Sequence, residues 1–343
     1  MRSMVGACSE FMLKGHKKAR VSGRTMDWFE EMYSNFVVVP RGTHVFSYYD
    51  GEDKEKQPLK QGMQWKTKYG FVGIDSWNLP IYLDGMNEMG LSAGLLALYG
   101  CGYPEPDKCP EKNISIGYLL QYVLGNCKDV NEVKEFLESG VTVCDLSVLY
   151  VADERSLHLV VHDAQGKSLV LEAEDGEIKI YLDEEASVLT NSPFLHWHLL
   201  NMRNYCNLTY KDATSDGPWT PLGHGSGMLG LPGDSTPPSR FVRLSMFREF
   251  SPISKDANEE VQQAFHMINR VALVNGEDII ERTLWEVVRD HVHRIYYFRT
   301  NQNQSIRAID LKEIDFSGFK QYKRIPLTTG NLYEDVTPLF EKG

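Results

Sequence analysis

Cys8 is the one cysteine of six that lies almost at the N-terminus, directly after Met1–Ala7. Clustered cysteines form metal sites or redox dithiols, but these six contain no CxxC pair and no tight cluster. The five others, which we expect to pack as small buried hydrophobic side chains, are Cys101, Cys109, Cys127, Cys144 and Cys206. Met1–Ala7 has no apolar core and is not a secretory signal as written. It is a short propeptide, the remnant of a longer leader, or a frayed tail before the first strand.

Four further polar residues interrupt apolar stretches of the chain. Arg24 and Asp27 stand beside apolar side chains ahead of a strand, and charges in such a setting are rarely buried unless they are paired or used. Asn191 follows the strand-like residues 188–190, where its amide can point into a cleft. Arg240 follows a rigid Pro- and Gly-rich loop and begins a helix. Each also has an ordinary structural explanation, namely an ion pair, a turn-capping Asn and a helix-start Arg.

Motifs for several other chemistries are missing. The sequence has no GxxxxGK[ST] phosphate loop and no GxGxxG after a strand. His224 and Met228 occupy the two positions around Ser226 where a GxSxG nucleophile elbow needs glycine. The close His pairs at 196/198 and 291/293 belong to no HExxH, and we expect them to be structural. We therefore expect no metal and no cofactor.

The composition excludes further classes of protein. The 343 residues carry 36 Lys and Arg against 47 Asp and Glu, which gives a net charge of −11 and a pI near 5.4. Such an acidic chain lacks the basic surface of a nucleic-acid binder. Hydrophobic residues at 42% and charged residues at 24% are typical of a globular protein. The longest apolar runs are far shorter than the ~20 residues that span a bilayer, so we expect no membrane span.

The elements that must position these residues are mostly strands. Segments rich in β-branched and aromatic residues predict strands at 36–39, 146–151, 157–161, 168–171, 178–181, 295–298 and 305–309. Turn sequences at 164–167 and 174–176 join three of them and predict an antiparallel meander.

Four segments show helical periodicity or capping signals. The helices that we predict span about 114–124, 130–139, a segment after Ser239 and about 259–274. In the second, Asp129 and Glu132 have the spacing of a capping box and Gly140 ends the helix. The pattern predicts an antiparallel α+β domain in which two helix pairs flank the sheets.

Eight short segments, in this order, resemble the choloylglycine hydrolase family, which includes bile salt hydrolases and penicillin V acylases. From the N-terminus they are Ala7-Cys8-Ser9, Gly23–Trp28, Val38–Gly42, Asp84–Leu91, Leu189–Pro193, Gly230–Asp234, Ser239–Phe241 and Tyr296–Thr300. The resemblance covers nearly the whole chain. It implies an N-terminal nucleophile (Ntn) hydrolase fold, which is a four-layer αββα sandwich, and cofactor-free hydrolysis of a linear amide C–N bond.

The resemblance also implies that residues 1–7 are removed and that residues 8–343 form a single catalytic domain. A thiol that attacks an amide needs a base, and a free α-amino group with a pKa near ~7.7 can accept the proton. The peptide nitrogen of an intact Ala7–Cys8 bond cannot. Autoproteolysis, a processing peptidase or removal of Met in a shorter chain would each expose Cys8.

Roles for the catalytic residues follow from the same resemblance. The Cys8 thiol attacks the carbonyl, and its α-amine passes the proton to the leaving amine. Asp27 holds the α-amine of Cys8 by a charged hydrogen bond, and Arg24 tunes the thiol and orients the site. The Asn191 amide stabilises the oxyanion, which is typically worth about 3–4 kcal/mol. Arg240 completes the polar network near the nucleophile.

Leu96 departs from the family pattern. It stands where bile salt hydrolases commonly have Asn and penicillin V acylases commonly have Tyr, so only its backbone N–H can serve the oxyanion hole. Together with Met26 and Trp77 it would form an apolar wall that favours a hydrophobic or aromatic acyl group, although ordinary core packing explains the three residues equally well. The substrate candidates are conjugated bile salts, phenoxyacetyl penicillins, N-acyl homoserine lactones and N-acylethanolamines.

Partner and compartment expectations complete the interpretation. The long excursion between Asn191 and Arg240 contains four aromatic residues, and in relatives such a segment packs against a neighbouring subunit. We therefore expect a homo-oligomer, specifically a tetramer, although the excursion could equally be a lid. The default compartment is cytoplasmic, and a truncated leader would make it periplasmic or secreted. The competing hypothesis is an unprocessed homologue that binds an acyl ligand without catalysis.

Overall fold

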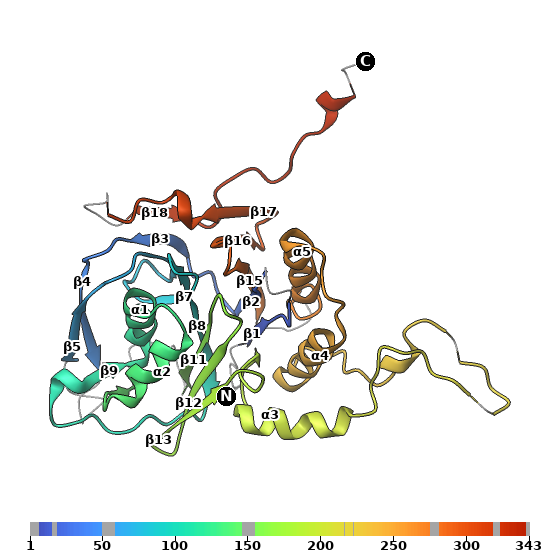
Figure 1. The fold of residues 1–343 in the computed structure, drawn as a ribbon, viewed down its shortest axis with the longest axis horizontal. Helices are drawn as coiled ribbons and strands as arrows, with labels where there is room; N and C mark the ends of the chain where they lie inside the picture. Colours follow the sequence, from blue (N-terminus) through green and yellow to red (C-terminus); the bar gives the residue numbers. More distant parts are fainter. Residues whose placement is uncertain are drawn as a thin grey trace.

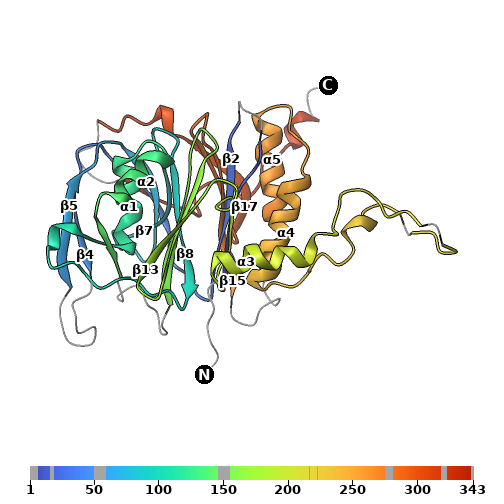
Figure 2. The same cartoon turned by 60° about the horizontal axis from the view of Figure 1, so that its bottom comes forward.

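Two antiparallel sheets packed face to face form the centre of the protein in a computed structural model, and helices cover both outer faces (Figures 1 and 2). The structure describes residues 7–15, 19–49, 59–145, 155–215, 217–221, 223–274, 281–317 and 323–340. This is the αββα arrangement of the Ntn-hydrolase fold expected from the sequence.

The first sheet carries the N-terminal strand in its interior. Its strands, in spatial order, are β14 (Val188–Leu189), β1 (Ala7–Met12), β2 (Val21–Trp28), β15 (Arg282–Asp290), β16 (Ile295–Thr300) and β17 (Asn303–Asp310). Every pairing in it is antiparallel. Because β1 has neighbours on both sides, the chain around Cys8 is fixed within the sheet.

The second sheet is larger and includes the predicted meander. Its strands, in spatial order, are β13 (Glu177–Leu182), β12 (Ser168–Glu174), β11 (Arg155–His162), β8 (Ser92–Tyr99), β7 (Tyr82–Asn87), β6 (Phe71–Asp75), β3 (Asn35–Val39) and β18 (Lys323–Pro326). Two smaller sheets pair β4 (His44–Tyr49) with β5 (Lys60–Lys66) and β9 (Asn113–Ser115) with β10 (Thr142–Cys144).

Helices cover the two outer faces in pairs, as predicted. On the larger sheet lie α1 (Ile116–Asn126) and α2 (Val130–Glu138), and on the smaller sheet lie α4 (Pro237–Phe250) and α5 (Ala257–Ile268). Asp129 caps α2 by accepting from the backbone N–H of Glu132, as the capping-box spacing predicted. A further helix, α3 (Leu195–Asn201), lies beside α4 and begins the long excursion.

Three predicted boundaries were wrong. The helix expected from residue 114 begins at Ile116, because Asn113–Ser115 pairs in parallel with β10. The helix predicted to begin after Ser239 already includes Pro237, which suits the first turn because its missing N–H would have no partner there. The helix expected to reach residue 274 ends at Ile268. The strand predicted at 146–151 lies outside the described residues.

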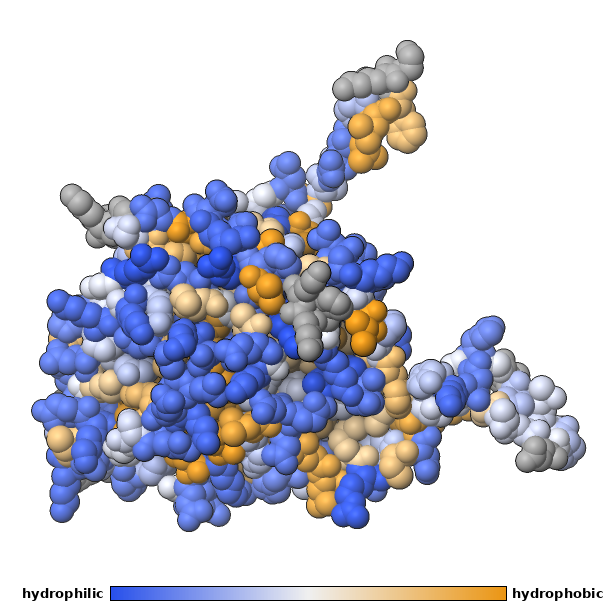
Figure 3. Space-filling view, in the orientation of Figure 1, coloured by the Kyte–Doolittle hydropathy of each residue, from blue (hydrophilic) through white to orange (hydrophobic). Residues whose placement is uncertain are grey.

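Two segments project from the body (Figure 1). The first, residues 203–236, which we call the arm, extends beyond α3 and α4. The second is the C-terminal segment after β18, near whose tip exposed apolar side chains gather (Figure 3). Leu339 and Phe340 in this segment are exposed. Among the described residues, no helix combines the length and apolar character needed to cross a membrane.

Candidate active site

Cys8 lies in β1 between the two sheets. In the pairing of β1 with β2 it stands opposite Met26, and its Sγ lies 3.6 Å from the Met26 Sδ. The residue is only 2% exposed. The nucleophile predicted from the sequence is therefore an interior side chain held by its strand.

The backbone of Cys8 is fixed by two side chains from distant parts of the chain. Its nitrogen donates to the Asn191 Oδ1 at 2.6 Å, and Arg240 Nη2 donates to the same oxygen at 2.9 Å. Arg240 Nη1 donates to the carbonyl oxygen of Cys8 at 2.6 Å and to the hydroxyl of Ser9 at 2.6 Å. The structure thus brings together Cys8, Asn191 and Arg240.

Asn191 follows β14, and its side-chain nitrogen, side-chain oxygen and backbone oxygen each have a different partner. Its Nδ2 donates to the carbonyl oxygen of Ala97 in β8 at 2.8 Å. That nitrogen carries two protons, so one more donation is chemically available. The backbone oxygen of Asn191 lies 2.8 Å from the Nε2 of His198 in α3. Since a carbonyl oxygen only accepts, this assigns the proton to that nitrogen of His198.

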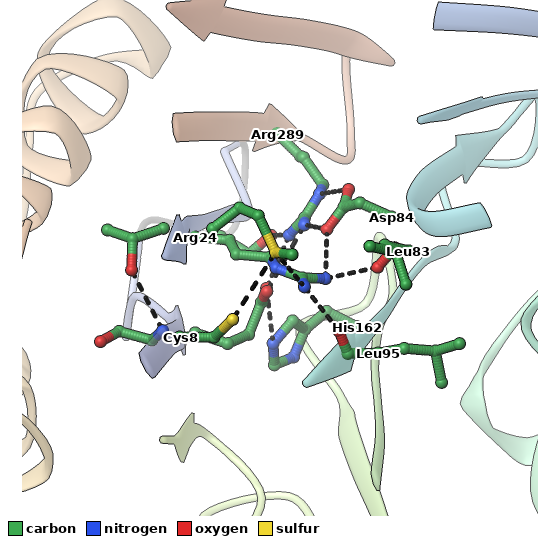
Figure 4. Close-up of polar contacts among 12 residues, drawn as sticks. Cys8, Arg24, Leu83, Asp84, Leu95, His162 and Arg289 are labelled. Atoms are coloured by element: carbon green, nitrogen blue, oxygen red, sulfur yellow. Dashed lines mark hydrogen bonds and ion pairs between the residues drawn. The ribbon is translucent and has the colours of Figure 1, made fainter. Parts of the chain in front are cut away.

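Arg24 lies in β2, on the same side as Met26, and is fully buried. Its guanidinium donates to Leu83 O at 2.6 Å, to Leu95 O at 2.5 Å and to Asp84 Oδ2 at 3.0 Å (Figure 4). Its Nη2 also lies 3.7 Å from the Met26 Sδ, the sulfur that contacts Cys8. Arg24 therefore crosses from the strand of one sheet to the strands of the other, directly behind the thiol.

Asp27 does not pair with Arg24, although the sequence analysis raised an ion pair as one explanation. The two residues are three positions apart in a strand, which places their side chains on opposite faces. Asp27 accepts from Thr283 at 2.5 Å and from Thr25 at 3.1 Å. Its backbone stands opposite Ala7, next to the Ala7–Cys8 peptide. Both charged residues lie within β2 and are fully buried, rather than partly buried ahead of a strand.

Burial sets the protonation of the nucleophile and its neighbours. It raises the pKa of the Cys8 thiol, and the nearby charges of Arg24 and Arg240 only partly oppose this effect. Burial also raises the pKa of Asp27 to about 7, against the influence of Arg240 and the two threonine hydroxyls. Burial lowers the pKa of Arg240. A thiol with a raised pKa is protonated at neutral pH and needs a base before it can attack.

The three residues of the predicted apolar wall all belong to the hydrophobic core or pack against it. Met26 and Leu96 are buried in the same core cluster as Cys8, and Trp77 packs against that cluster. The Trp77 ring meets Trp28 edge to face at 6.4 Å between centroids. The backbone of Trp77 adopts a φ of 53°, which is uncommon for a bulky residue. Leu96 lies in β8 opposite His158 of β11.

Three buried charged residues close to Arg24 were not assigned a role from the sequence. They are Glu10 in β1, Asp84 in β7 and Arg289 in β15. Asp84 does fall inside one of the segments that resemble the family, but only the fold brings it to Arg24. A buried charge in a strand is the signal that could have identified all three. Among the described residues, no group of three or more His, Cys, Asp or Glu could hold a metal ion.

Comparisons with known proteins agree with this geometry. The family model described as linear amide C–N hydrolases, choloylglycine hydrolase family, matches residues 8–323. The chain is 31% identical over 330 residues to a bile salt hydrolase/transferase of Clostridium perfringens, covering 92% of this chain and 96% of that protein. It is 27% identical to a penicillin V acylase of Pectobacterium atrosepticum, covering 91% of this chain and 82% of that protein.

Solved structures give the same relationship. A mutant of the conjugated bile acid hydrolase from Clostridium perfringens superposes with a TM-score of 0.79 at 28% identity, covering 96% of this chain and 100% of that one. The penicillin V acylase from Agrobacterium tumefaciens superposes with a TM-score of 0.75 at 28% identity, covering 93% of this chain and 91% of that one.

Proposed function

The chain belongs to the choloylglycine hydrolase family of linear amide C–N hydrolases, and we propose that Cys8 is the nucleophile with which it cleaves its amide substrate. The observation that carries the proposal is the convergence of Asn191 and Arg240 on the backbone of Cys8. Three segments separated by up to 232 positions meet at this one residue. An ordinary buried cysteine needs no such arrangement around its nitrogen and carbonyl oxygen.

We also propose that residues 1–7 are removed and that residues 8–343 form the working catalytic domain. The family match begins at residue 8, which supports this boundary. The raised pKa of the thiol supports it as well, because a thiol that is protonated at neutral pH needs a base, and the neutral form of a free α-amine would supply one on the same residue. We propose that Asp27, whose backbone stands opposite Ala7, binds the ammonium group that cleavage would create.

The proposed reaction proceeds in two stages. The α-amine takes the thiol proton, the sulfur forms a bond to the substrate carbonyl carbon, and the negative charge moves to the carbonyl oxygen. The second N–H of Asn191 and the backbone N–H of Leu96 stabilise that oxyanion. The C–N bond then breaks as the α-ammonium returns the proton to the leaving amine. Water hydrolyses the remaining acyl-enzyme by the same proton route and releases the free acid.

The substrate that this site favours is an amide between an apolar acyl group and a small polar amine. Met26 supports this assignment, because its sulfur lies 3.6 Å from the thiol and an apolar side chain there gains free energy by excluding water from an apolar acyl group. Leu96 belongs to the same core cluster and Trp77 packs against it. The named activities of the relatives make glycine- and taurine-conjugated bile salts and phenoxyacetyl penicillin the first amides to test.

A substrate panel tests the proposal. Purified protein is incubated with conjugated bile salts, phenoxyacetyl penicillin, an N-acyl homoserine lactone and an N-acylethanolamine, and the free amine is quantified. We expect release of amine from at least one apolar acyl amide and no release by Cys8→Ala. If Cys8→Ala retained full activity, the assignment of the nucleophile would be wrong. Binding of an acyl amide without any release of amine would favour the unprocessed binding protein.

We further propose that the arm mediates assembly into a homo-oligomer, specifically a tetramer. Trp219 and Leu229 in the arm are 82% and 78% exposed, and Tyr210 is 67% exposed. Large apolar side chains at such exposure on a projecting segment are typical of a surface that a partner covers. A second copy of the chain is the partner that a symmetric assembly would supply.

A further inference from the structure

A chain of buried charges continues from Arg24 away from the thiol (Figure 4). Asp84 accepts from Arg24 and also receives two N–H groups of Arg289, with the Nε–Oδ1 distance at 3.1 Å. Glu10 in turn accepts from Arg289 Nη1 at 2.6 Å and from its Nη2 at 3.4 Å. Each of the four side chains is at most 1% exposed.

The charges balance, but they are shared unequally. Two guanidinium groups face two carboxyl groups, so the four charges cancel when both carboxyl groups are ionised. Burial raises the pKa of Asp84, and the positive charges of Arg289 and Arg24 oppose this effect. Asp84 is held by both Nε and Nη2 of Arg289 and accepts a hydrogen bond from the hydroxyl of Tyr296. Arg24 reaches it through a single nitrogen, Nη1. Most of the negative charge of Asp84 is therefore compensated by Arg289 rather than by Arg24.

Contacts other than the ion pair keep Arg24 in place. Two backbone carbonyl oxygens, those of Leu83 and Leu95, accept from its two terminal nitrogens, and its guanidinium carbon lies 5.4 Å from the Trp285 ring centroid. A Cβ at Gly94 would lie 2.6 Å from Arg24 Nη1, so the side chain fits closely against β8. Its Nε has no hydrogen-bond partner among the described residues. Arg24 would thus remain behind the thiol even if the charge of Asp84 were removed.

The remaining groups around the cluster include two histidines. Those that face Arg24, Asp84, Arg289 or Glu10 from the packed elements are Cys8, Ser22, His162, Trp285, His291 and Tyr296. Burial lowers the pKa of His291 to about 3, so its imidazole is neutral at physiological pH. Although burial acts in the opposite direction, Arg289 and His162 lower the pKa of Glu10 to about 2, so that carboxylate is ionised. Asp27 and Arg240 act on the thiol from its other side.

We propose that Arg289, Asp84 and Glu10 are positioning residues that set the reactivity of the Cys8 thiol through Arg24. Arg289 is held in place by Glu10, and its positive charge compensates the negative charge of Asp84. Asp84 therefore neutralises Arg24 less than it would without Arg289. The positive charge of Arg24 then remains available to stabilise a thiolate at Cys8. The inference rests on the proposed role of Cys8. It adds three residues, on three different strands, that influence the pKa of its thiol.

The test compares the ionisation of the Cys8 thiol among variants of the active enzyme. The rate of alkylation of Cys8 by iodoacetamide is measured between pH 5 and 10, with mass spectrometry of the Cys8 peptide distinguishing it from the other five cysteines. Asp84→Asn removes a negative charge beside Arg24 and is expected to lower the apparent pKa of the thiol by about 1 unit. Arg289→Met leaves the negative charge of Asp84 to be compensated by Arg24 alone. This variant is expected to raise the apparent pKa of the thiol by about 1 unit.

Two further variants complete the design. Arg248→Met is the matched control, because Arg248 is another buried arginine that holds a carboxylate, Glu184, but contacts neither Arg24 nor Asp84. It should leave the thiol pKa unchanged. The double variant Glu10→Gln/Arg289→Met removes both charges together and preserves the charge balance. It should raise the thiol pKa as Arg289→Met does, and it replaces that variant if the single change prevents folding.

Opposite shifts in Asp84→Asn and Arg289→Met, with no shift in the control, support the proposal. Shifts in the same direction, or an unchanged thiol pKa with only a lower melting temperature, would overturn it and leave the cluster a purely structural one. Because alkylation reports the thiol without substrate turnover, this outcome is separate from that of the proposed function. If Cys8→Ala hydrolysed amides fully, the assignment of Cys8 as the nucleophile would be wrong. The shifts in thiol pKa measured by alkylation would still stand.

Discussion

The backbone nitrogen of Cys8 lies 2.6 Å from the side-chain oxygen of Asn191, a residue 183 positions further along the chain. In an uncleaved chain this contact involves a peptide N–H. Cleavage before Cys8 would leave an amine at the same place, already beside one acceptor. The fold therefore provides a binding place for the α-amine that the proposed mechanism needs, and Asn191 contributes to it with one end of its amide while the other end faces β8.

Replacing Asn191 tests its proposed role at the oxyanion. We expect Asn191→Ala to lower kcat by about 10²- to 10³-fold with a much smaller change in KM, because the lost donor acts mainly on the transition state. Asn191→Asp keeps an acceptor for the Cys8 nitrogen but loses the donor, so it should be equally inactive. Steady-state kinetics provide the measurement.

Ser192→Ala is the matched control for these two variants. Among the described residues its hydroxyl bonds only to the backbone of Tyr99, and its loss should leave kcat within a few-fold of the parent enzyme. Retention of activity by Asn191→Asp would assign the role of Asn191 to holding the nitrogen alone.

The raised pKa of Asp27 should make the stability of the protein depend on pH. Its pKa in the folded chain is about 7, above the value of about 3.9 for an unperturbed Asp. Between these values the folded state binds more protons than the unfolded state, so the free energy of unfolding should fall as pH rises from 4 to 7. We expect Asp27→Asn to lose this decrease, which is about 3 kcal/mol. Urea unfolding at several pH values, on chains that retain residues 1–7, measures it. Identical pH profiles for the two chains would contradict the assignment.

A substitution at Leu96 tests whether its backbone N–H or its side chain takes part in the reaction. Since only its N–H is assigned to the oxyanion, Leu96→Ala should keep kcat within a few-fold for the preferred substrate. Its KM for a large apolar acyl group should rise, because apolar contact area near the thiol is lost. A panel of amides with acyl groups of increasing size provides the comparison. A collapse of kcat for every acyl group would show that the side chain itself is essential to the reaction.

The arm gives a prediction about assembly. Trp219→Asp and Leu229→Asp together place two charges on its exposed apolar surface and should convert the oligomer to smaller species without unfolding the body. Size-exclusion chromatography with light scattering measures the mass. Ile253→Asp is the control, since Ile253 is 74% exposed outside the arm. An unchanged mass in the double variant, or a monomeric parent protein, would refute the assembly proposal.

Local signals in the sequence predicted most of the regular elements. The meander of β11, β12 and β13 was predicted because β-branched runs are separated by Gly-containing turns, and α2 because Asp129 and Glu132 form a capping box. α3 was not predicted, since Phe194 at its start supplies no side-chain cap and the helix is only seven residues long. α5 ends at Ile268, before the apolar pattern does, because the backbone N–H groups of Arg270 and Val271 bond three residues back, to Met267 and Ile268, instead of four.

The site was predictable to the extent that its residues lie in recognisable segments. Cys8, Arg24, Asp27, Asn191 and Arg240 were all assigned from the sequence, and the structure places Cys8, Asn191 and Arg240 in direct contact. The partners of Arg24 were not assigned. Glu10 and Arg289 meet across 279 positions through the pairing of distant strands, and no local pattern encodes such a contact.

The N-terminus of the active enzyme tests the central claim most directly. Intact mass and N-terminal sequencing of active protein should show a chain that begins at Cys8 and lacks residues 1–7. Cys8→Ala should be folded, with a circular dichroism spectrum like that of the parent, but should release no amine. Full activity of a chain in which Ala7 is still bonded to Cys8 would contradict the account, because no free α-amine would then be available as the base.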